Sequence, residues 1–341
     1  MKKYGHDFKI LEVSLRDSSY IIDFSWPLDF VLKTAENLGR IFPQIEVGHG
    51  LGLGAWRLYP HSFKDEELLL SLIPLREKLK IQFLMFFIPG IAKLDDAILA
   101  KDLNLYGIRF GVNADEFEKN LVFLEKIKSL GFFTTLNLMK TYILSPKEVA
   151  KIAKKVKDFV DVFYLVDSAG TMLPENLQNY IFEVYDTVPE IVLGFHGHNN
   201  LGLATANALL ALENGVFWID TTLSGIGRSG GNVSTEAFWS ILLKRGWADS
   251  EETLFQLINI SLEFRHYIEQ MGRYFSVNPE DVLYGYAGFH SSFEGIVREF
   301  CRQYQLDYVS FVVNLCHLSR SKVNQEILEQ VLKTCENVRY F

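Results

Sequence analysis

The feature that most constrains the fold is a regular alternation of short β-type segments with longer helical segments. Runs rich in β-branched and aromatic residues recur at intervals of roughly 25 to 37 residues, which is the rhythm of repeated βα units. The runs occupy residues 8–14, 44–48, 81–87, 106–112, 132–138, 162–166, 191–195 and 218–223. Eight such units favour a closed (β/α)8 TIM barrel over an open sheet.

The segments between these runs have the apolar spacing of amphipathic helices. Apolar residues stand three and four positions apart in the ranges 28–39, 114–131, 146–156 and 201–215. Glycines stand just past several of these patterns, and Ser145-Pro146 opens another. These segments are predicted to be outer helices of the barrel.

The alternation stops after about residue 250. Three later ranges, 252–274, 279–284 and 293–338, have helical patterns with aromatic content. We therefore predict a TIM-barrel catalytic domain over residues 1–250. A helical C-terminal domain over residues 251–341 is expected to contribute to the active site and to oligomerisation.

Composition excludes several classes of function. The net charge of −8 leaves no basic face for nucleic acid, and no apolar run reaches the roughly 18 residues of a membrane span. The N-terminus has polar residues, including His6 and Asp7, where an export signal needs an apolar core. Cys301, Cys316 and Cys335 lack metal or redox spacing. A cytoplasmic protein with reduced thiols is expected.

Polar residues follow the predicted strands at the rim where a TIM barrel carries its reactive groups. His196-Gly197-His198 follows an apolar run, and histidines at i and i+2 of an extended segment point to one side. Asp17 follows the first run. An isolated histidine pair could equally be structural, but two nitrogens and one oxygen on this rim indicate a catalytic metal site.

A glycine-rich loop, residues 225–232, follows the eighth predicted strand. Its glycines would let the backbone approach a ligand closely. The side-chain carbonyl of Asn232 suits a hard cation, so this residue is a candidate additional ligand.

Several of these motifs together resemble the metal-dependent aldolases, lyases and acyl-condensing enzymes related to isopropylmalate synthase and 3-hydroxy-3-methylglutaryl-CoA lyase, the DRE-TIM superfamily. The motifs are residues 14–17, 196–204 and 225–232. Within that group the chain most resembles the 4-hydroxy-2-oxovalerate aldolases, through residues 45–52, 166–170 and 285–288. The resemblance extends from residue 10 to about residue 295.

The resemblance implies a class II aldolase that cleaves or forms a 4-hydroxy-2-oxoacid through a metal-stabilised pyruvate enolate. It assigns Asp17, His196 and His198 as ligands of a divalent metal. Mn²⁺ is the expected ion, with Mg²⁺, Co²⁺ and Zn²⁺ as alternatives. The aldehyde and the physiological direction are left open.

The resemblance also implies which residues contact the substrate, and His196 is one of them. Arg16 would stabilise the enolate, although an ion pair with Glu46 that merely ties two strands together is the alternative. Ser168 matches a substrate-contacting serine, or it could cap the helix ahead of Pro174. A further set, Glu46, His49 and Asp167, is expected to orient the ligands.

Two positions depart from the aldolase pattern. Tyr20 stands where the aldolases have a histidine as general base, and His290 stands where they have a tyrosine. Because an imidazole pKa near neutrality suits a base, we hypothesise that His290 moves the proton and also contacts substrate, while Tyr20 orients or donates. Alternatively, the exchange removed activity and His290 only packs against Tyr284, Tyr286 and Phe293.

Two functions other than an aldolase are also considered. Ser229 replaces the reactive cysteine of the CoA lyases, and the sequence of residues 228–231 departs from the condensing synthases. A Claisen-type condensation of acyl-CoA with a 2-oxoacid, or a non-catalytic metal-binding paralogue, are the alternatives. A homo-oligomer is expected. An aldehyde dehydrogenase partner is not, since the resemblance fades beyond about residue 295.

Overall fold

The chain forms a closed barrel of eight parallel strands in sequence order, and the computed structural model describes residues 8–335. Strand β1 pairs with β2 on one side and with β8 on the other, which closes the barrel. The eight strands are β1 (Lys9–Glu12), β2 (Gln44–Glu46), β3 (Gln82–Phe87), β4 (Gly107–Asn113), β5 (Phe133–Met139), β6 (Val162–Asp167), β7 (Leu193–Gly197) and β8 (Trp218–Thr221). Each of the predicted runs is confirmed as a strand, with shifts of a few residues at the ends.

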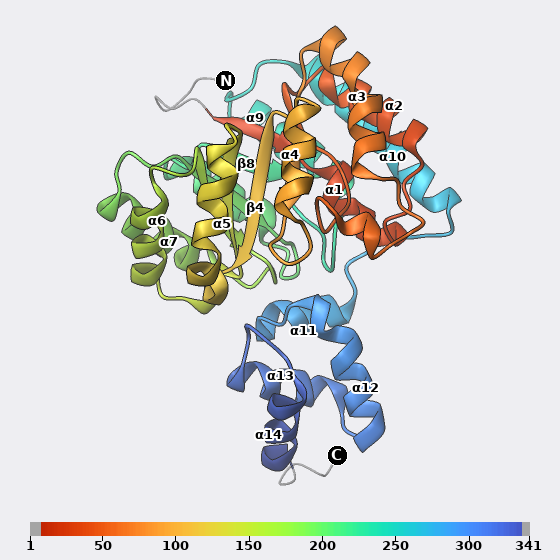
Figure 1. The fold of residues 1–341 in the computed structure, drawn as a ribbon. Coiled ribbons are helices and arrows are strands. Elements are labelled where there is room, and N and C mark those ends of the chain that lie inside the picture. The colour runs from red at the N-terminus through yellow and green to blue at the C-terminus, as the bar shows by residue number, and fades with distance from the viewer. Residues whose placement is uncertain (1–7, 336–341) are drawn as a thin grey trace.

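Helices follow the strands and cover the outside of the barrel (Figure 1). Helix α6 shows how they begin: Pro146 occupies its first turn, and the Ser145 side chain and Glu148 cap each other's backbone. The helices are α1 (Ser14–Asp17), α2 (Leu28–Gly39), α3 (Asp65–Leu79), α4 (Leu94–Asp102), α5 (Phe117–Ser129), α6 (Pro146–Val156), α7 (Pro174–Thr187), α8 (Ala204–Glu213) and α9 (Thr235–Lys244).

Strand alternation divides the buried apolar residues into two layers. Phe163 and Leu165 of β6 pack into the large cluster between strands and helices. Their neighbours Tyr164 and Val166 belong to a smaller cluster inside the barrel, with Leu11 of β1. The barrel interior is therefore a packed core, and the polar residues of the site lie above it.

The last helices form a second lobe with its own core (Figure 1). Helix α10 (Glu251–Gln270) still packs on the barrel through Leu257, Phe264 and Ile268, so the division lies after α10 and not at residue 250. The lobe contains α11 (Pro279–Ala287), α12 (Glu294–Tyr304), α13 (Tyr308–Leu318) and α14 (Gln325–Cys335). The range 293–338 is thus broken into three helices, because Gln305 is left-handed and Ser319 is extended.

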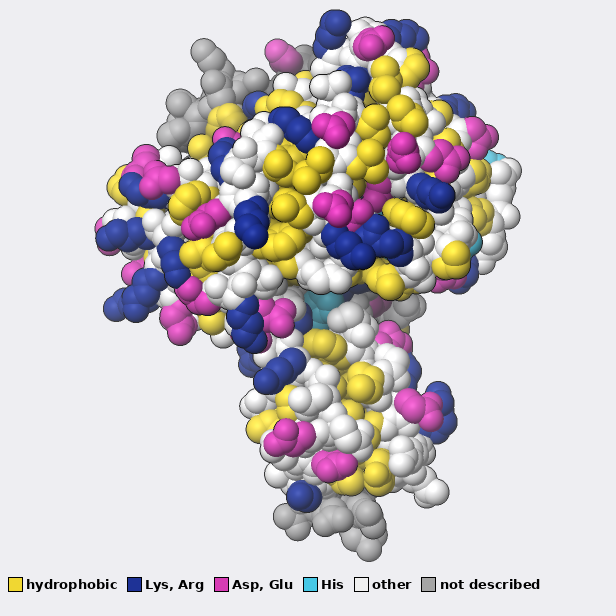
Figure 2. All heavy atoms as spheres, in the orientation of Figure 1, with side chains coloured by type: hydrophobic (Ala, Val, Ile, Leu, Met, Phe, Trp, Pro, Cys, Tyr) yellow, Lys and Arg dark blue, Asp and Glu magenta, His cyan; other side chains and the backbone are white. Residues whose placement is uncertain are grey.

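The surface agrees with the composition. Figure 2 shows basic and acidic side chains mixed over the visible face, with histidine at the constriction between barrel and lobe.

Within residues 8–335, no helix combines the length and apolar character that crossing a membrane would require. The prediction about an export signal concerns residues 1–7, which lie outside the described residues, as do the side chain of Cys335 and residues 336–338 of the last predicted helix. Oligomeric state and partners stay predictions.

Candidate metal centre and active site

Three predicted ligands meet at the rim formed by the carboxyl ends of the strands. Asp17 ends the short helix α1 that directly follows β1, while His196 lies in β7 and His198 just beyond it. Their ligand atoms lie within 4.8 Å of one another, and all three residues are buried. The fold therefore brings together the carboxylate and imidazoles that the sequence pattern selected.

Both imidazoles are held from behind by hydrogen-bond acceptors. His196 Nδ1 lies 2.8 Å from Oδ2 of Asp220, and His198 Nδ1 lies 3.2 Å from the carbonyl oxygens of Arg228 and Gly231. Each Nδ1 must carry a proton to donate these bonds, so each Nε2 presents a lone pair. Burial and the nearby Arg228 guanidinium hold the pKa of His198 well below its ordinary value, which favours the neutral ring.

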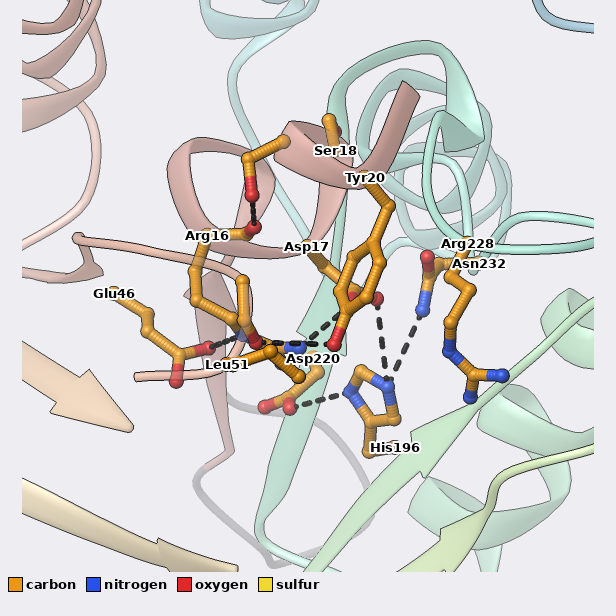
Figure 3. A network of polar contacts seen from close by, with 12 residues as sticks. Arg16, Asp17, Ser18, Tyr20, Glu46, Leu51, His196, Asp220, Arg228 and Asn232 are labelled. Atoms are coloured by element: carbon orange, nitrogen blue, oxygen red, sulfur yellow. Dashed lines mark hydrogen bonds and ion pairs between the residues drawn. The ribbon is translucent and has the colours of Figure 1, made fainter. Parts of the chain in front are cut away.

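Unsatisfied oxygen atoms complete the donor set. Oδ2 of Asp17 and Oδ1 of Asn232 are buried, and neither has a hydrogen-bond partner among the described residues. Asp17 Oδ2 lies 3.7 Å from His196 Nε2 (Figure 3). The amide nitrogen Nδ2 of Asn232 lies 3.3 Å from the same nitrogen, so the amide would have to turn over to offer Oδ1 at this point. A Cβ at Gly227 would come within 1.7 Å of Asn232 Oδ1, so any other residue there would displace the Asn232 amide.

This donor set fits a divalent cation. Carboxylate, amide oxygen and neutral imidazole suit metals of the Mn²⁺ and Zn²⁺ type. Burial alone raises the pKa of Asp17, but Arg16 and the neighbouring histidines and Arg228 hold it well below its usual range, so the carboxylate is ionised. Arg228 Nη2 lies 3.2 Å from His198 Nε2, and a bound cation would take that lone pair in its place.

A buried network of charges supports the ligands from inside the barrel (Figure 3). Arg16 donates to Asp17 at 2.6 Å and to Glu46 at 3.0 Å, so the ion pair with Glu46 that the sequence offered as its alternative role is present. Arg109, which is fully buried, donates to Glu46 at 2.5 Å and to Asp220. Three carboxylates and two guanidiniums thus form one buried network behind the candidate metal ligands.

Neither Arg109 nor Asp220 was among the predicted site residues. The signal that could have identified them is a charged residue inside an otherwise apolar strand run, at 106–112 and 218–223. Such a residue inside a barrel needs an opposite charge at the same level, because an isolated charge is costly to bury.

Two residues expected to orient the ligands do so only indirectly. His49 accepts from the backbone N–H of Leu51 at 3.0 Å and stacks on Phe24, and burial lowers its pKa to about 4. The Asp167 carboxylate accepts from the N–H groups of Thr171 and Met172, and burial raises its pKa to about 6. Both side chains hold loops, and Asp167 reaches the centre through its backbone carbonyl, which accepts from the His198 N–H at 3.1 Å. Glu46 bonds Arg16 through its side chain.

A cavity of about 400 Å³ opens over the metal ligands and reaches the C-terminal lobe. Arg16, Ser168 and His196 line it, as the sequence predicted for substrate contacts. Ser168 Oγ accepts from the Lys140 N–H at 2.9 Å, so its own proton is free for a ligand. The alternative that Ser168 caps the following helix is wrong, because α7 begins with Leu173 as its N-cap.

The exchanged pair, Tyr20 and His290, lies in this same cavity. Burial raises the pKa of Tyr20 to about 12, and its hydroxyl donates to the Gly50 carbonyl at 3.3 Å. It therefore keeps its proton at neutral pH and can donate.

Burial lowers the pKa of His290 well below its ordinary value, so the expectation of a pKa near neutrality is wrong. His290 Nδ1 accepts from the Ser292 N–H at 3.3 Å and lies 2.6 Å from Ser292 Oγ. Of the predicted aromatic neighbours, Phe293 lies 5.8 Å away between ring centroids, while Tyr286 is 73% exposed. The aromatic packing proposed as an alternative role is therefore only partly formed.

Comparisons with known proteins agree with this geometry. The HMGL-like family profile matches residues 107–262. A 4-hydroxy-2-oxovalerate aldolase of Geobacillus genomosp. 3 is 33% identical, covering 84% of both chains, and an oxaloacetate decarboxylase of Mycobacterium tuberculosis is 30% identical, covering 83% of both. The HMG-CoA lyase of Brucella melitensis, at 17% identity, superposes with a TM-score of 0.65 over 78% of this chain and all of that chain, which supports the fold.

Proposed function

The chain belongs to the HMGL-like family, and we propose that it is a divalent-metal-dependent aldolase that cleaves or forms a 4-hydroxy-2-oxoacid. The products of cleavage would be pyruvate and an aldehyde. The observation that carries this proposal is the buried cluster of Asp17, His196 and His198, whose ligand atoms lie within 4.8 Å of one another on the barrel rim.

A divalent cation held by these residues and Asn232 would polarise the 2-oxo group and stabilise the enolate charge, with Mn²⁺ as the first ion to test. Arg16 is fixed by two carboxylates, so its guanidinium needs no reorganisation to stabilise the developing oxyanion. The free hydroxyl proton of Ser168 would bond the carboxylate of the 2-oxoacid.

Cleavage breaks the bond between C3 and C4 after a base removes the 4-hydroxyl proton, and the enolate then regains a proton at C3. We assign the base role to His290, since its ring is neutral and Tyr20 holds its own proton. Ser292 lines the cavity and its hydroxyl lies 2.6 Å from Nδ1, so it can take the substrate proton while passing its own to His290.

Decarboxylation of a 2-oxoacid is the second candidate. The relative named oxaloacetate decarboxylase, at 30% identity, favours it. Loss of CO₂ from the carbon next to the ketone leaves the same pyruvate enolate, so the same cluster would serve. It differs from aldol cleavage in needing no base for a 4-hydroxyl group.

The test is pyruvate release with Mn²⁺ from a panel of 4-hydroxy-2-oxoacids and from oxaloacetate. We expect release from at least one hydroxy-oxoacid and its loss in Asp17→Asn. Asp115→Asn, which removes one carboxylate charge elsewhere in the cavity, is the matched control and should retain activity. Release from oxaloacetate alone would replace the aldolase with a decarboxylase, and no release from any compound would contradict both.

A further inference from the structure

Arg228 is a half-buried cation that lines the cavity. Its guanidinium donates to Ser291 Oγ at 2.6 Å and to the Ser168 carbonyl at 3.0 Å. Among the described residues no carboxylate oxygen forms an ion pair with it. Arg16 in the same cavity has both Asp17 and Glu46. The Asp17 carboxylate acts on Arg228 only from beyond ion-pair distance, and such a charge is costly at a partly buried position.

Lys140 adds a second positive charge under similar conditions. It is 3% exposed, and its ammonium donates to the Ser321 carbonyl at 2.7 Å and lies 4.5 Å from the Phe293 ring. Burial lowers its pKa to about 8, and Arg228 acts in the same direction, while Asp115 and Glu116 act against it from exposed positions. Two cations that disfavour each other therefore share one cavity, and neither forms an ion pair within residues 8–335.

A cavity that holds two such charges is suited to an anion, because an anionic ligand would make the direct ion-pair contacts that the described carboxylates do not make with them. Arg228 presents the planar fork that binds carboxylate or phosphate oxygens in pairs. A cation bound by His198 would also compete for the nitrogen that Arg228 now contacts at 3.2 Å, which would release the guanidinium for this ligand.

We propose that Arg228, supported by Lys140, forms a subsite for a second anionic group on the substrate, a carboxylate or a phosphate. Placing this group on the half that becomes the aldehyde rests on the proposed function, in which Ser168 takes the carboxylate of the 2-oxoacid. The preferred substrates would then be dianions, with one charge at each end.

The subsite can be tested by binding, without turnover. 2-Oxoadipate and 2-oxohexanoate have the same chain length and differ in the terminal carboxylate, and their affinities can be measured calorimetrically in the presence of Mn²⁺. We expect the native protein to prefer the dianion roughly ten- to a hundredfold, the range for a hydrogen bond to a charged group. Arg228→Gln should remove most of that preference, and Arg228→Lys should retain part of it.

The matched control is Arg57→Gln, since Arg57 has Asp96 as its partner and does not line the cavity. This variant should leave the preference unchanged. 2-Oxo-5-phosphonopentanoate separates the two anion types, because it carries its phosphonate on the carbon that bears the terminal carboxylate in 2-oxoadipate. Tighter binding than 2-oxoadipate would identify phosphate, and weaker binding would identify carboxylate. Equal affinity of the native protein for the charged and neutral ligands would overturn the subsite, and so would equal weakening of both by Arg228→Gln.

The same proteins can be assayed for pyruvate release. A preference for dianions without any release would contradict the proposed function and leave the subsite intact. Release without such a preference would do the reverse.

Discussion

The two sides of the cavity differ in whether their cationic side chains form ion pairs. On the barrel side, Arg16 and Arg109 are paired with Asp17, Glu46 and Asp220 in a closed buried network. On the side of the loops and the lobe, Arg228 and Lys140 donate to neutral oxygens. Paired charges fix side chains in place, whereas unpaired ones gain most from a ligand. The first side is thus suited to holding the reacting centre and the second to recognising what is bound.

Among the proposed substitutions, removal of Arg109 should cause the largest loss of stability, because it disrupts the buried ion-pair network. In Arg109→Met the buried carboxylates of Glu46 and Asp220 lose their shared partner, so we expect the free energy of unfolding to fall by about 3–5 kcal/mol. Urea denaturation measures this loss. Arg57→Met, which removes a partly exposed ion pair with Asp96, should cost about 0.2–1 kcal/mol. Equal losses of unfolding free energy in both variants would show that the buried network stabilises the fold no more than a partly exposed ion pair does.

Substitution of His290 tests the proton transfer assigned to the lobe side. Removing a general base typically lowers turnover by about 10² or more, so His290→Ala should lose activity to that extent. Tyr20→Phe should lose less, because the raised pKa of Tyr20 leaves it only a donor role. Steady-state rates on the best substrate of the panel decide between them. A larger loss in Tyr20→Phe would reverse the assignment.

A milder substitution, at Asp220, tests whether the orientation of His196 contributes to metal affinity. Asp220→Asn removes the carboxylate that bonds His196 Nδ1, and we expect Mn²⁺ affinity to fall by about 10–100-fold. Titration calorimetry provides the measurement. Asp161→Asn serves as the control, since Asp161 pairs with Lys128 away from the cavity and its loss should leave affinity unchanged. Unchanged affinity in Asp220→Asn would mean that His196 is oriented by packing alone.

The same contrast explains what the sequence could predict. The regular spacing of runs rich in β-branched and aromatic residues made all eight strands visible. His196 follows directly after such a run, and Asp17 and His198 lie within three residues of one. Arg109 and Asp220 were missed because each is a single charge whose partner comes from a distant strand. The apolar face of α10 shows that the helix packs, but not whether it packs on the barrel or on the lobe.

The surroundings of Arg228 and Lys140 could not be predicted, because they depend on how the C-terminal lobe packs over the rim of the barrel. Arg228 meets Ser291, and Lys140 meets Ser321, across large separations in sequence. A local pattern records neither contact. The pKa values of Lys140 and His290 likewise follow from burial that only the folded lobe creates.

The most direct test of the metal centre is the exchange of the pyruvate methyl protons in D₂O, because it requires the enolate but no particular aldehyde. NMR spectra recorded after removal of the metal report the fraction exchanged. We predict exchange that depends on added Mn²⁺, persists in Asp115→Asn and is lost in Asp17→Asn. Pyruvate that binds to the Mn²⁺-loaded native protein and keeps its methyl protons would contradict enolate chemistry at Asp17, His196 and His198.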